Sequence, residues 1–288
     1  MLDRIDRMVK TNPLWVDITW NAGGVTSEIT LDLCSHIQKY MGVDVLMHIT
    51  CTFMTREKIL KSLNDAKQMG IKNLLALRGD PPRGVEDWVH NDNGFNYAID
   101  LVKFIRQEFG DYFTICVAGY PEVHLSATSR ADDIQHLKEK VDAGADFIIT
   151  QLFYDNKIFY DWVRDCRAAG INVPIIPGIM PILGYERFKR MCKFTKTIVP
   201  KEIVDQLELV KNDDQAVQDY GVRQSIQQTQ DLIKNGFRFI HYYTMNLETA
   251  VLKVISGNGT LNVGRALPRQ LSNSRTDETT RPIFWNHN

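Results

Sequence analysis

The stretch LLALRGDPP, residues 74–82, ends a short apolar run with an arginine, a glycine, an aspartate and two prolines. An apolar run of this length is typical of a strand buried in a parallel sheet, and glycine and proline after it are typical of a tight turn. In α/β proteins the functional groups lie at the carboxyl ends of such strands. The stretch therefore predicts a strand over residues 73–77 whose exit presents Arg78 and Asp80 to a functional site.

The same order of strand, loop, helix and glycine repeats along the chain. Further strands are expected over residues 14–20, 43–50, 113–118, 147–151, 174–179 and 237–243. Helices are expected over residues 27–40, 55–69, 94–109, 129–143, 156–169, 213–234 and 247–255, and several of them are followed by a glycine. This order is typical of right-handed βαβ units around a parallel sheet.

No GxGxxG motif is present to open a dinucleotide-binding sheet, so a (β/α)8 TIM barrel is favoured over a doubly wound sheet. Such a barrel has eight strands, whereas seven are expected here. Because the chain opens on an amphipathic segment that resembles the end of a helix, we expect the first strand to precede Met1. Residues 1–256 are expected to form the barrel domain. Residues 257–288, which are rich in small polar and charged residues, are expected to form a linker.

The composition argues against several classes of protein. The chain has 288 residues, of which 44% are hydrophobic, and its net charge of -1 disfavours a general nucleic-acid or membrane-surface binder. No apolar run approaches the length of a membrane span, and the first residues do not resemble a secretory signal. The five cysteines form no CxxC pair, so the sequence suggests neither a metal site nor a disulfide framework. A reducing, cytoplasmic location is the simplest expectation.

Six stretches taken together resemble one known family. They are LLALRGDPP, NGFNYAIDLV, ICVAGYPEVH, HLKEKVDAGADFIITQLFYD, VPIIPGIMPI and HYYTMN, and they follow the family's order between residues 2 and 255. The chain resembles the catalytic barrel of methylenetetrahydrofolate reductase. It is similar to the eukaryotic branch, because RPIFW at residues 281–285 resembles the start of that branch's linker to a C-terminal regulatory domain. No such domain follows in this sequence.

The resemblance implies a flavoprotein oxidoreductase of folate, one-carbon and methionine metabolism. Members of this family carry FAD on the barrel and pass a hydride from NAD(P)H to 5,10-methylenetetrahydrofolate, giving 5-methyltetrahydrofolate. The sequence does not choose between NADPH and NADH. The expected partner is a small-molecule folate, with no nucleic acid and no membrane. Association into a homo-oligomer is left open, because a barrel without one strand has two unpaired sheet edges.

The resemblance also assigns site residues. Asp80 matches the carboxylate that stabilises the cationic iminium form of the folate, and it is the expected catalytic residue. FAD is expected to contact Thr19, Trp20, His48, Arg78, Gly79, Asp80, Tyr97, Ala98, Tyr120, His124, Ala127, Asp133 and Lys140. The folate is expected to contact Gln151 and Tyr243.

Without the resemblance, these residue types have simpler interpretations. Asp80 would pair with Arg78 or cap the turn, Trp20 would cover the core, and His48 would be a buried histidine with satisfied hydrogen bonds. The remaining alternatives are an apolar helix face for Ala98, a capping aromatic for Tyr120, a strand-end amide for Gln151, and a solvated charged face for Asp133 and Lys140.

Three departures from the family pattern bear on activity. The loop from His124 to Ala127 reads His-Leu-Ser-Ala in place of His-Pro-Glu-Ala, which removes a rigid proline and a polar contact. Leu247 stands where the family has an arginine for the folate, so weaker folate binding is expected. The family's Glu-Phe-Phe-Pro-Pro motif, whose glutamate protonates the folate, does not occur, and we assign its role to no residue. An incomplete gene model, a deliberate fragment and a chain that really starts at Met1 are the alternatives, and an incomplete gene model, truncated at both ends, is the expected explanation.

Two hypotheses from different classes follow. The leading hypothesis is a flavin-dependent methylenetetrahydrofolate reductase domain, which predicts NAD(P)H oxidation with an artificial electron acceptor but little folate turnover. The alternative is a non-enzymatic flavin- or folate-binding relative that has lost the general acid. An aldolase-type barrel enzyme is disfavoured, because no strand ends in a lysine placed for a Schiff base.

Overall fold

The computed structural model describes residues 2–20, 27–79 and 93–259, and these contain seven strands. The strands are β1 (Trp15–Ile18), β2 (Asp44–Thr50), β3 (Asn73–Leu77), β4 (Thr114–Gly119), β5 (Phe147–Leu152), β6 (Ile175–Ile179) and β7 (His241–Tyr242). They follow chain order in the sheet, and each pair whose register is described is parallel. The predicted α/β topology of the TIM-barrel type is therefore confirmed. The strand expected before Met1 remains a prediction.

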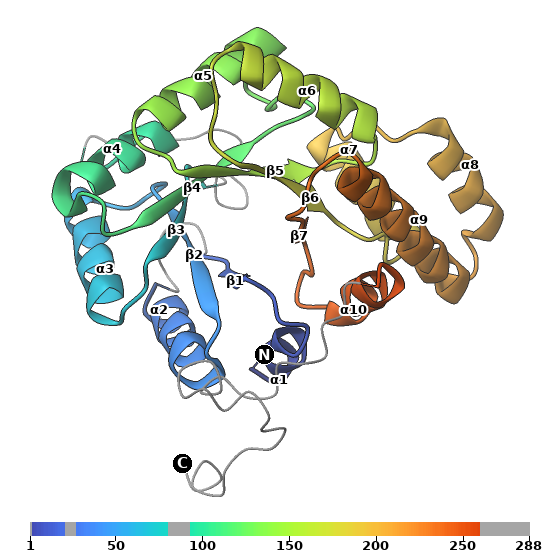
Figure 1. Ribbon diagram of the computed structural model, residues 1–288, viewed down its shortest axis with the longest axis horizontal. Helices are drawn as coiled ribbons and strands as arrows, with labels where there is room; N and C mark the ends of the chain where they lie inside the picture. Colours follow the sequence, from blue (N-terminus) through green and yellow to red (C-terminus); the bar gives the residue numbers. More distant parts are fainter. Residues whose placement is uncertain (1, 21–26, 80–92, 260–288) are drawn as a thin grey trace, which may run out of the picture. The chain divides into compact units, whose positions relative to one another are not determined.

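Helices alternate with the strands along the chain (Figure 1). They are α1 (Leu2–Val9), α2 (Ser27–His36), the π-helix η2 (Ile37–Met41), α3 (Arg56–Gln68), α4 (Ala98–Phe109), α5 (Arg130–Asp142), α6 (Asn156–Ala168), α7 (Tyr185–Thr195), α8 (Lys201–Val210), α9 (Asp214–Lys234) and α10 (Glu248–Gly257). Gly70 has a φ of +77°, as expected for the glycine that follows α3. The linker predicted from residue 257 lies almost entirely outside the described residues and stays a prediction.

Two expected element starts were wrong. Helix α4 begins at Ala98 and not at residue 94, because the backbone N–H of Tyr97 donates to the Asp100 carboxylate at 3.1 Å and so caps the helix there. Strand β7 has only two residues in place of the expected 237–243. The ring of Phe237 packs edge-on against Phe159 at 4.8 Å between centroids, so this side chain belongs to packing against α6 and not to a strand.

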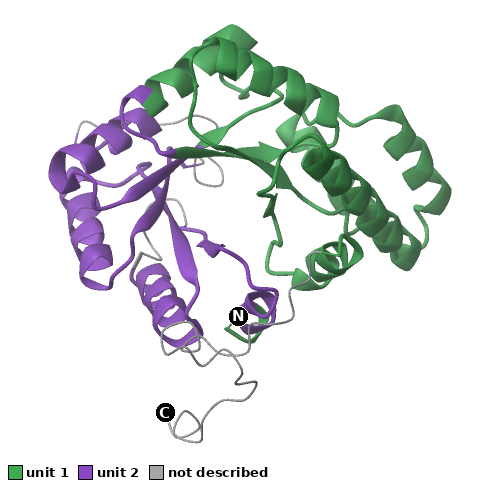
Figure 2. Cartoon of the chain, in the orientation of Figure 1, with its two compact units in different colours: residues 1–4, 118–141, 147–261 green, residues 5–117, 142–146, 262–288 purple. Residues whose placement is uncertain are grey.

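The described residues form two compact units (Figure 2). Unit 1 contains residues 2–4, 118–141 and 147–259, and unit 2 contains residues 5–20, 27–79, 93–117 and 142–146. Strands β1 to β3 and the larger part of β4 belong to unit 2, and β5 to β7 belong to unit 1.

In unit 2, helices α3 and α4 bury one apolar stripe each. Ile59 and Leu63 in α3, and Leu101 and Ile105 in α4, are spaced four residues apart and are completely buried. Burying one such side chain stabilises the folded state by about 1.5–3 kcal/mol relative to leaving it exposed. The apolar residues spaced four apart in α3 and α4 thus form a core in unit 2 that holds the ends of the strands in place.

A second feature of unit 2 is the side chain of Arg106, which ties α4 to the segments on both sides of β4. Its guanidinium donates to the carbonyl oxygens of Gly110, Phe113 and Gly144 at 2.7–3.1 Å. It also pairs with the Asp146 carboxylate at 2.6 Å, and its side chain is only 18% exposed. One shielded cation therefore satisfies carbonyl groups from two loops, the one before β4 and the one before β5.

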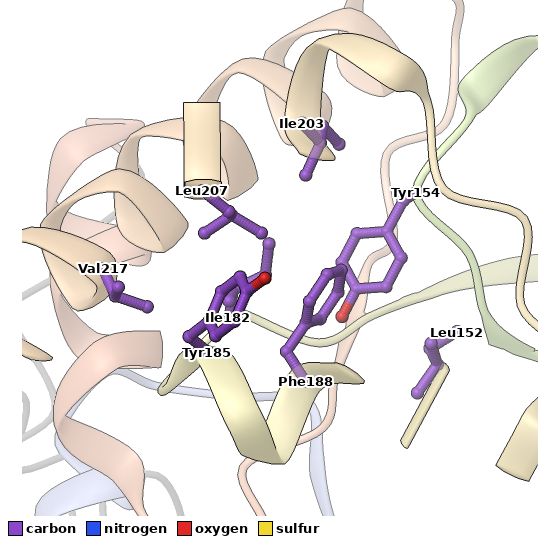
Figure 3. Packing of buried hydrophobic residues seen from close by; sticks show 8 residues of the cluster. All are labelled: Leu152, Tyr154, Ile182, Tyr185, Phe188, Ile203, Leu207 and Val217. Atoms are coloured by element: carbon purple, nitrogen blue, oxygen red, sulfur yellow. The ribbon is translucent and has the colours of Figure 1, made fainter. Parts of the chain in front are cut away.

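In unit 1, an apolar cluster fills the space between β5 and helices α7, α8 and α9 (Figure 3). Its buried members are Leu152, Tyr154, Ile182, Tyr185, Phe188, Ile203, Leu207 and Val217. The rings of Tyr154 and Phe188 meet edge to face with centroids 5.2 Å apart, an arrangement that aromatic rings prefer. The Tyr154 hydroxyl donates to the Met180 carbonyl at 3.2 Å, so its burial leaves no polar atom unpaired.

Candidate functional site

The exit of β3 in unit 2 is built around a glycine. The backbone N–H of Thr52 donates to the Arg78 carbonyl at 2.9 Å, and the Thr52 hydroxyl donates to the same oxygen. Gly79 has a φ of +89°, and a Cβ at this position would lie 2.9 Å from the Cβ of Thr50. Only glycine fits this backbone without strain, because the chain leaves the sheet in close packing against Thr50 of β2.

The Arg78 side chain lies over the Tyr97 ring, with 4.7 Å between the guanidinium carbon and the ring centroid. Tyr97 is 57% exposed, and the half-buried Ala98 begins α4 directly after it. The structure therefore brings three of the predicted FAD residues together. Asp80 lies outside the described residues, so both its predicted catalytic role and its alternative pairing with Arg78 stay predictions.

The predicted residues at the end of β1 differ in their burial. Thr19 is exposed, whereas Trp20 is buried with only 2% of its surface exposed. The indole Nε1 of Trp20 is buried and has no hydrogen-bond partner among the described residues. The burial agrees with the simpler interpretation of Trp20 as a core residue, and the unpaired donor leaves it able to bind a ligand.

His48, on β2, pairs with a carboxylate that the sequence analysis did not single out. Its Nε2 lies 3.1 Å from Oδ2 of Asp17, on β1, and both side chains are 14% exposed. The Trp15 indole Nε1 donates to Oδ1 of the same carboxylate at 2.8 Å. A signal for Asp17 was present, since it is the one acidic residue in the apolar stretch LWVDITW, but its partner was not readable from the sequence.

In unit 1, the loop after β4 holds Tyr120 and His124 against each other, with ring centroids 4.6 Å apart. The backbone N–H of Ser126 donates to Nδ1 of His124 at 3.2 Å, and the Ser126 hydroxyl lies 2.7 Å from the same nitrogen. The N–H of Ala127 donates to the His124 carbonyl at 2.9 Å. These hydrogen bonds hold the loop in place at the positions where this chain has Leu125 and Ser126 and the family pattern has Pro-Glu.

Asp133 and Lys140, both on α5, lie near this loop. Lys140 Nζ donates to the Ala118 carbonyl at 3.0 Å and lies 6.0 Å from the Tyr120 ring centroid. Asp133 is only 9% exposed, and its burial raises the pKa of its carboxyl, while the Lys140 cation and a hydrogen bond from the His124 backbone oppose the rise. The alternative of a solvated charged face is therefore wrong for Asp133.

The two predicted folate residues lie at neighbouring positions. The Tyr243 hydroxyl donates to the carbonyl of Thr150 at 2.8 Å, directly before Gln151. The Gln151 side-chain oxygen accepts the backbone N–H of Leu152 at 3.0 Å, which fixes the amide and leaves its NH₂ group as a donor.

A half-buried carboxylate in the same unit was also missed. The N–H of Ile198 donates to Oε2 of Glu122 at 3.1 Å. Burial, opposed by this hydrogen bond and reinforced by the nearby Asp155 carboxylate, raises the pKa of Glu122 to about 7. The sequence offered only a glutamate inside ICVAGYPEVH, and nothing in that pattern indicates burial.

Residues 2–20, 27–79 and 93–259 contain no group of three or more His, Cys, Asp or Glu side chains that could hold a metal ion. In the same residues, no helix is long and apolar enough to cross a bilayer.

Comparison with known proteins decides the family. A family model described as methylenetetrahydrofolate reductase matches residues 1–259. The chain belongs to the methylenetetrahydrofolate reductase family. Methylenetetrahydrofolate reductase (NADH) 1 of Arabidopsis thaliana is 44% identical over 299 residues, which cover 99% of this chain and 50% of that protein. A probable methylenetetrahydrofolate reductase (NADPH) of Caenorhabditis elegans is 41% identical, covering 99% of this chain and 44% of that protein. The resemblance to eukaryotic members is thus confirmed.

The chain spans about half the length of the curated relatives it matches. Among solved structures, a Clostridium thermocellum protein described as binding two copies of 5-methyl-5,6,7,8-tetrahydrofolic acid aligns with a TM-score of 0.46 and 16% identity. That alignment covers 88% of this chain and 98% of the other.

Proposed function

We propose that this chain binds FAD and uses a reduced nicotinamide nucleotide to reduce 5,10-methylenetetrahydrofolate to 5-methyltetrahydrofolate. The observation that carries the proposal is the family match over residues 1–259, together with the clustering of matched positions in each unit. Relatives of this chain are named for NADH and for NADPH, so the proposal includes both nucleotides.

Each unit, taken by itself, contains residues whose chemistry suits FAD. FAD is an anion with a flat aromatic ring, and bound FAD supplies the hydride acceptor and donor of the reaction. In unit 2, Gly79 allows close approach of the backbone, the Arg78 guanidinium supplies a cation, and Trp20 offers a buried donor without a partner. In unit 1, Lys140 lies beside the ring of Tyr120 and supplies a second cation.

On the substrate side, Asp80 would stabilise the cationic iminium form of the folate, because a carboxylate lowers the energy of a nearby developing cation. Gln151 is held by its own strand so that its NH₂ group can donate to a pterin ring, and Tyr243 lies beside it. Leu247 contributes no charge, so the chain is expected to bind folate more weakly than a relative with arginine there.

Binding of FAD tests the first half of the proposal. The purified 288-residue chain is expected to be yellow, and titration of the apoprotein should quench flavin fluorescence. Replacing Lys140 with methionine should weaken FAD binding about tenfold, since one charge-assisted contact is lost. The matched control is Lys157→Met, because the Lys157 side chain is 81% exposed and, among the described residues, forms an ion pair only with Asp161 on its own helix. A colourless protein that takes up no FAD would refute the proposal.

Turnover separates this proposal from the non-enzymatic alternative. An enzyme should oxidise NADH or NADPH when an artificial electron acceptor is present, since this step needs no protonation of the folate. Folate turnover is expected to be slow, because the sequence lacks the glutamate motif. FAD binding without any nicotinamide oxidation would favour the flavin-binding alternative.

A further inference from the structure

Asp17 is held at both oxygens by side chains from two strands. Oδ1 accepts the Trp15 indole N–H at 2.8 Å, and Oδ2 lies 3.1 Å from Nε2 of His48. Two partners at two oxygens fix the rotation of the carboxylate, so the carboxylate in turn fixes the plane and direction of the His48 ring.

The sheet register explains why these two side chains meet. Asp17 on β1 lies opposite Leu46 on β2, and His48 is two residues further along β2. Side chains two apart along a strand share one face, so His48 lies on the same face as Asp17, one step nearer the carboxyl end of the strands. Thr19, two residues after Asp17, continues toward the same end.

The pairing decides which nitrogen of His48 remains for a ligand. An ionised carboxylate only accepts hydrogen bonds, so Nε2 carries a proton. Nδ1 makes no hydrogen bond to any of the residues that the structure describes. It is therefore the ring nitrogen left for another molecule: an acceptor in the neutral ring and a donor in the charged ring.

Stability alone does not account for the pair. Both side chains are 14% exposed, and shielding an ionised carboxylate from water costs free energy that its partners must offset. A well-packed apolar pair between two adjacent strands would stabilise the sheet at least as well. What the Asp17–His48 pair supplies, and an apolar pair cannot, is a ring of fixed orientation with one free nitrogen.

We propose that Asp17 is a positioning residue, which acts through His48 by orienting its imidazole so that Nδ1 contacts the flavin. This inference rests on the proposed function, because His48 is one of the positions matched to an FAD contact. Asp17 itself touches the histidine and not the flavin. Its substitution should therefore matter only while His48 is present.

A double-mutant cycle on FAD binding tests this dependence. Dissociation constants are measured by flavin fluorescence for the wild-type chain, Asp17→Asn, His48→Gln and the double variant. Asp17→Asn is expected to weaken FAD binding about tenfold in the wild-type background, the scale of one hydrogen bond to a charged group. In the His48→Gln background the same change should cost less than about twofold.

The controls separate positioning from folding. Asp44→Asn removes an exposed carboxylate at the start of β2 and should leave the dissociation constant unchanged. Thermal unfolding of each variant checks that it is folded. Should Asp17→Asn fail to fold, Trp15→Phe, which releases Oδ1, serves in the same cycle and should give a smaller loss that also depends on His48.

Three outcomes would count against the inference. An equal loss in both backgrounds would show that Asp17 acts on strand packing and not through His48. Unchanged FAD binding in a folded Asp17→Asn variant would overturn the inference while leaving the proposed function intact. A wild-type chain that binds no FAD would overturn the proposed function and, with it, the role of Asp17.

Discussion

Substitution of Gly79 by alanine should destabilise the chain through two effects that the structure allows to be separated. The first is backbone strain, because a φ of +89° costs a residue with a Cβ about 1–2 kcal/mol. The second is a collision, since the new Cβ would lie 2.9 Å from Cβ and 3.2 Å from Cγ2 of Thr50. The Thr50 Cβ is bonded directly to the backbone of β2 and cannot rotate away. Overpacking of this kind costs about 1–3 kcal/mol, so we expect a total of about 2–5 kcal/mol.

Gly70 provides the matched control. Its φ is +77°, close to that of Gly79, but a Cβ there would have no atom within 4 Å. Gly70→Ala should therefore show the backbone strain alone, about 1–2 kcal/mol. The free energy of unfolding of both variants is measured by urea denaturation followed by circular dichroism, with equal m-values as the condition for comparing them. Equal destabilisation of the two variants would refute the reasoning, because it would mean that the contact with Thr50 relaxes without cost.

Two further predictions concern buried charges. Arg106→Met should lower the free energy of unfolding, measured by urea titration, by about 3 kcal/mol, because it leaves carbonyl groups and a carboxylate without their shared donor. The control Arg164→Met, at a side chain that is 71% exposed, should cost less than about 0.5 kcal/mol. Similar losses in the two variants would contradict the role assigned to the Arg106 hydrogen bonds. Burial raises the pKa of Glu122 to about 7. Between about pH 4.5 and pH 7 the folded state therefore keeps a proton that the unfolded state releases. The free energy of unfolding of the wild-type chain should fall as the pH rises through this range. Glu122→Gln removes this pH dependence. Its free energy of unfolding relative to wild type should rise by about 1–2 kcal/mol between pH 4 and pH 8, a value discounted for the partial exposure of the Glu122 side chain. A difference between the two chains that stays constant with pH would show that titration of Glu122 does not affect stability.

The periodicity of the chain predicted most of the fold. Apolar runs, some of them followed by Gly or Pro, predicted all seven observed strands. Helical spacing, in several cases with a terminal glycine, predicted α2 to α6, α9 and α10, whereas α7 and α8 were not placed individually. The errors came where tertiary contacts compete with local pattern. Phe237 has the apolar character of a strand residue, but its ring packs against α6, so β7 begins only at His241.

The part of the candidate site that depends on the type of residue at the end of a strand could be predicted from the sequence. Gly79 was expected to allow close approach of the flavin, which stays a prediction; the structure shows a positive φ and close packing against Thr50, which require glycine there. Burial was not predictable in the same way. Asp133 and Lys140 are seven residues apart on one helix face, a pattern that fits a solvated face as well as the buried position that Asp133 takes.

By itself, the sequence determined the alternation of strands and helices, the glycine at the exit of β3 and the family to which the chain belongs, because each depends on neighbouring residues or on their order. Only the tertiary structure decided that Asp17 meets His48. These residues are 31 positions apart, and their contact requires the register of two parallel strands in which Asp17 faces Leu46. A shift of one residue would turn every side chain of β1 to the other face, so the pairing that orients His48 is a property of the sheet and not of any local motif.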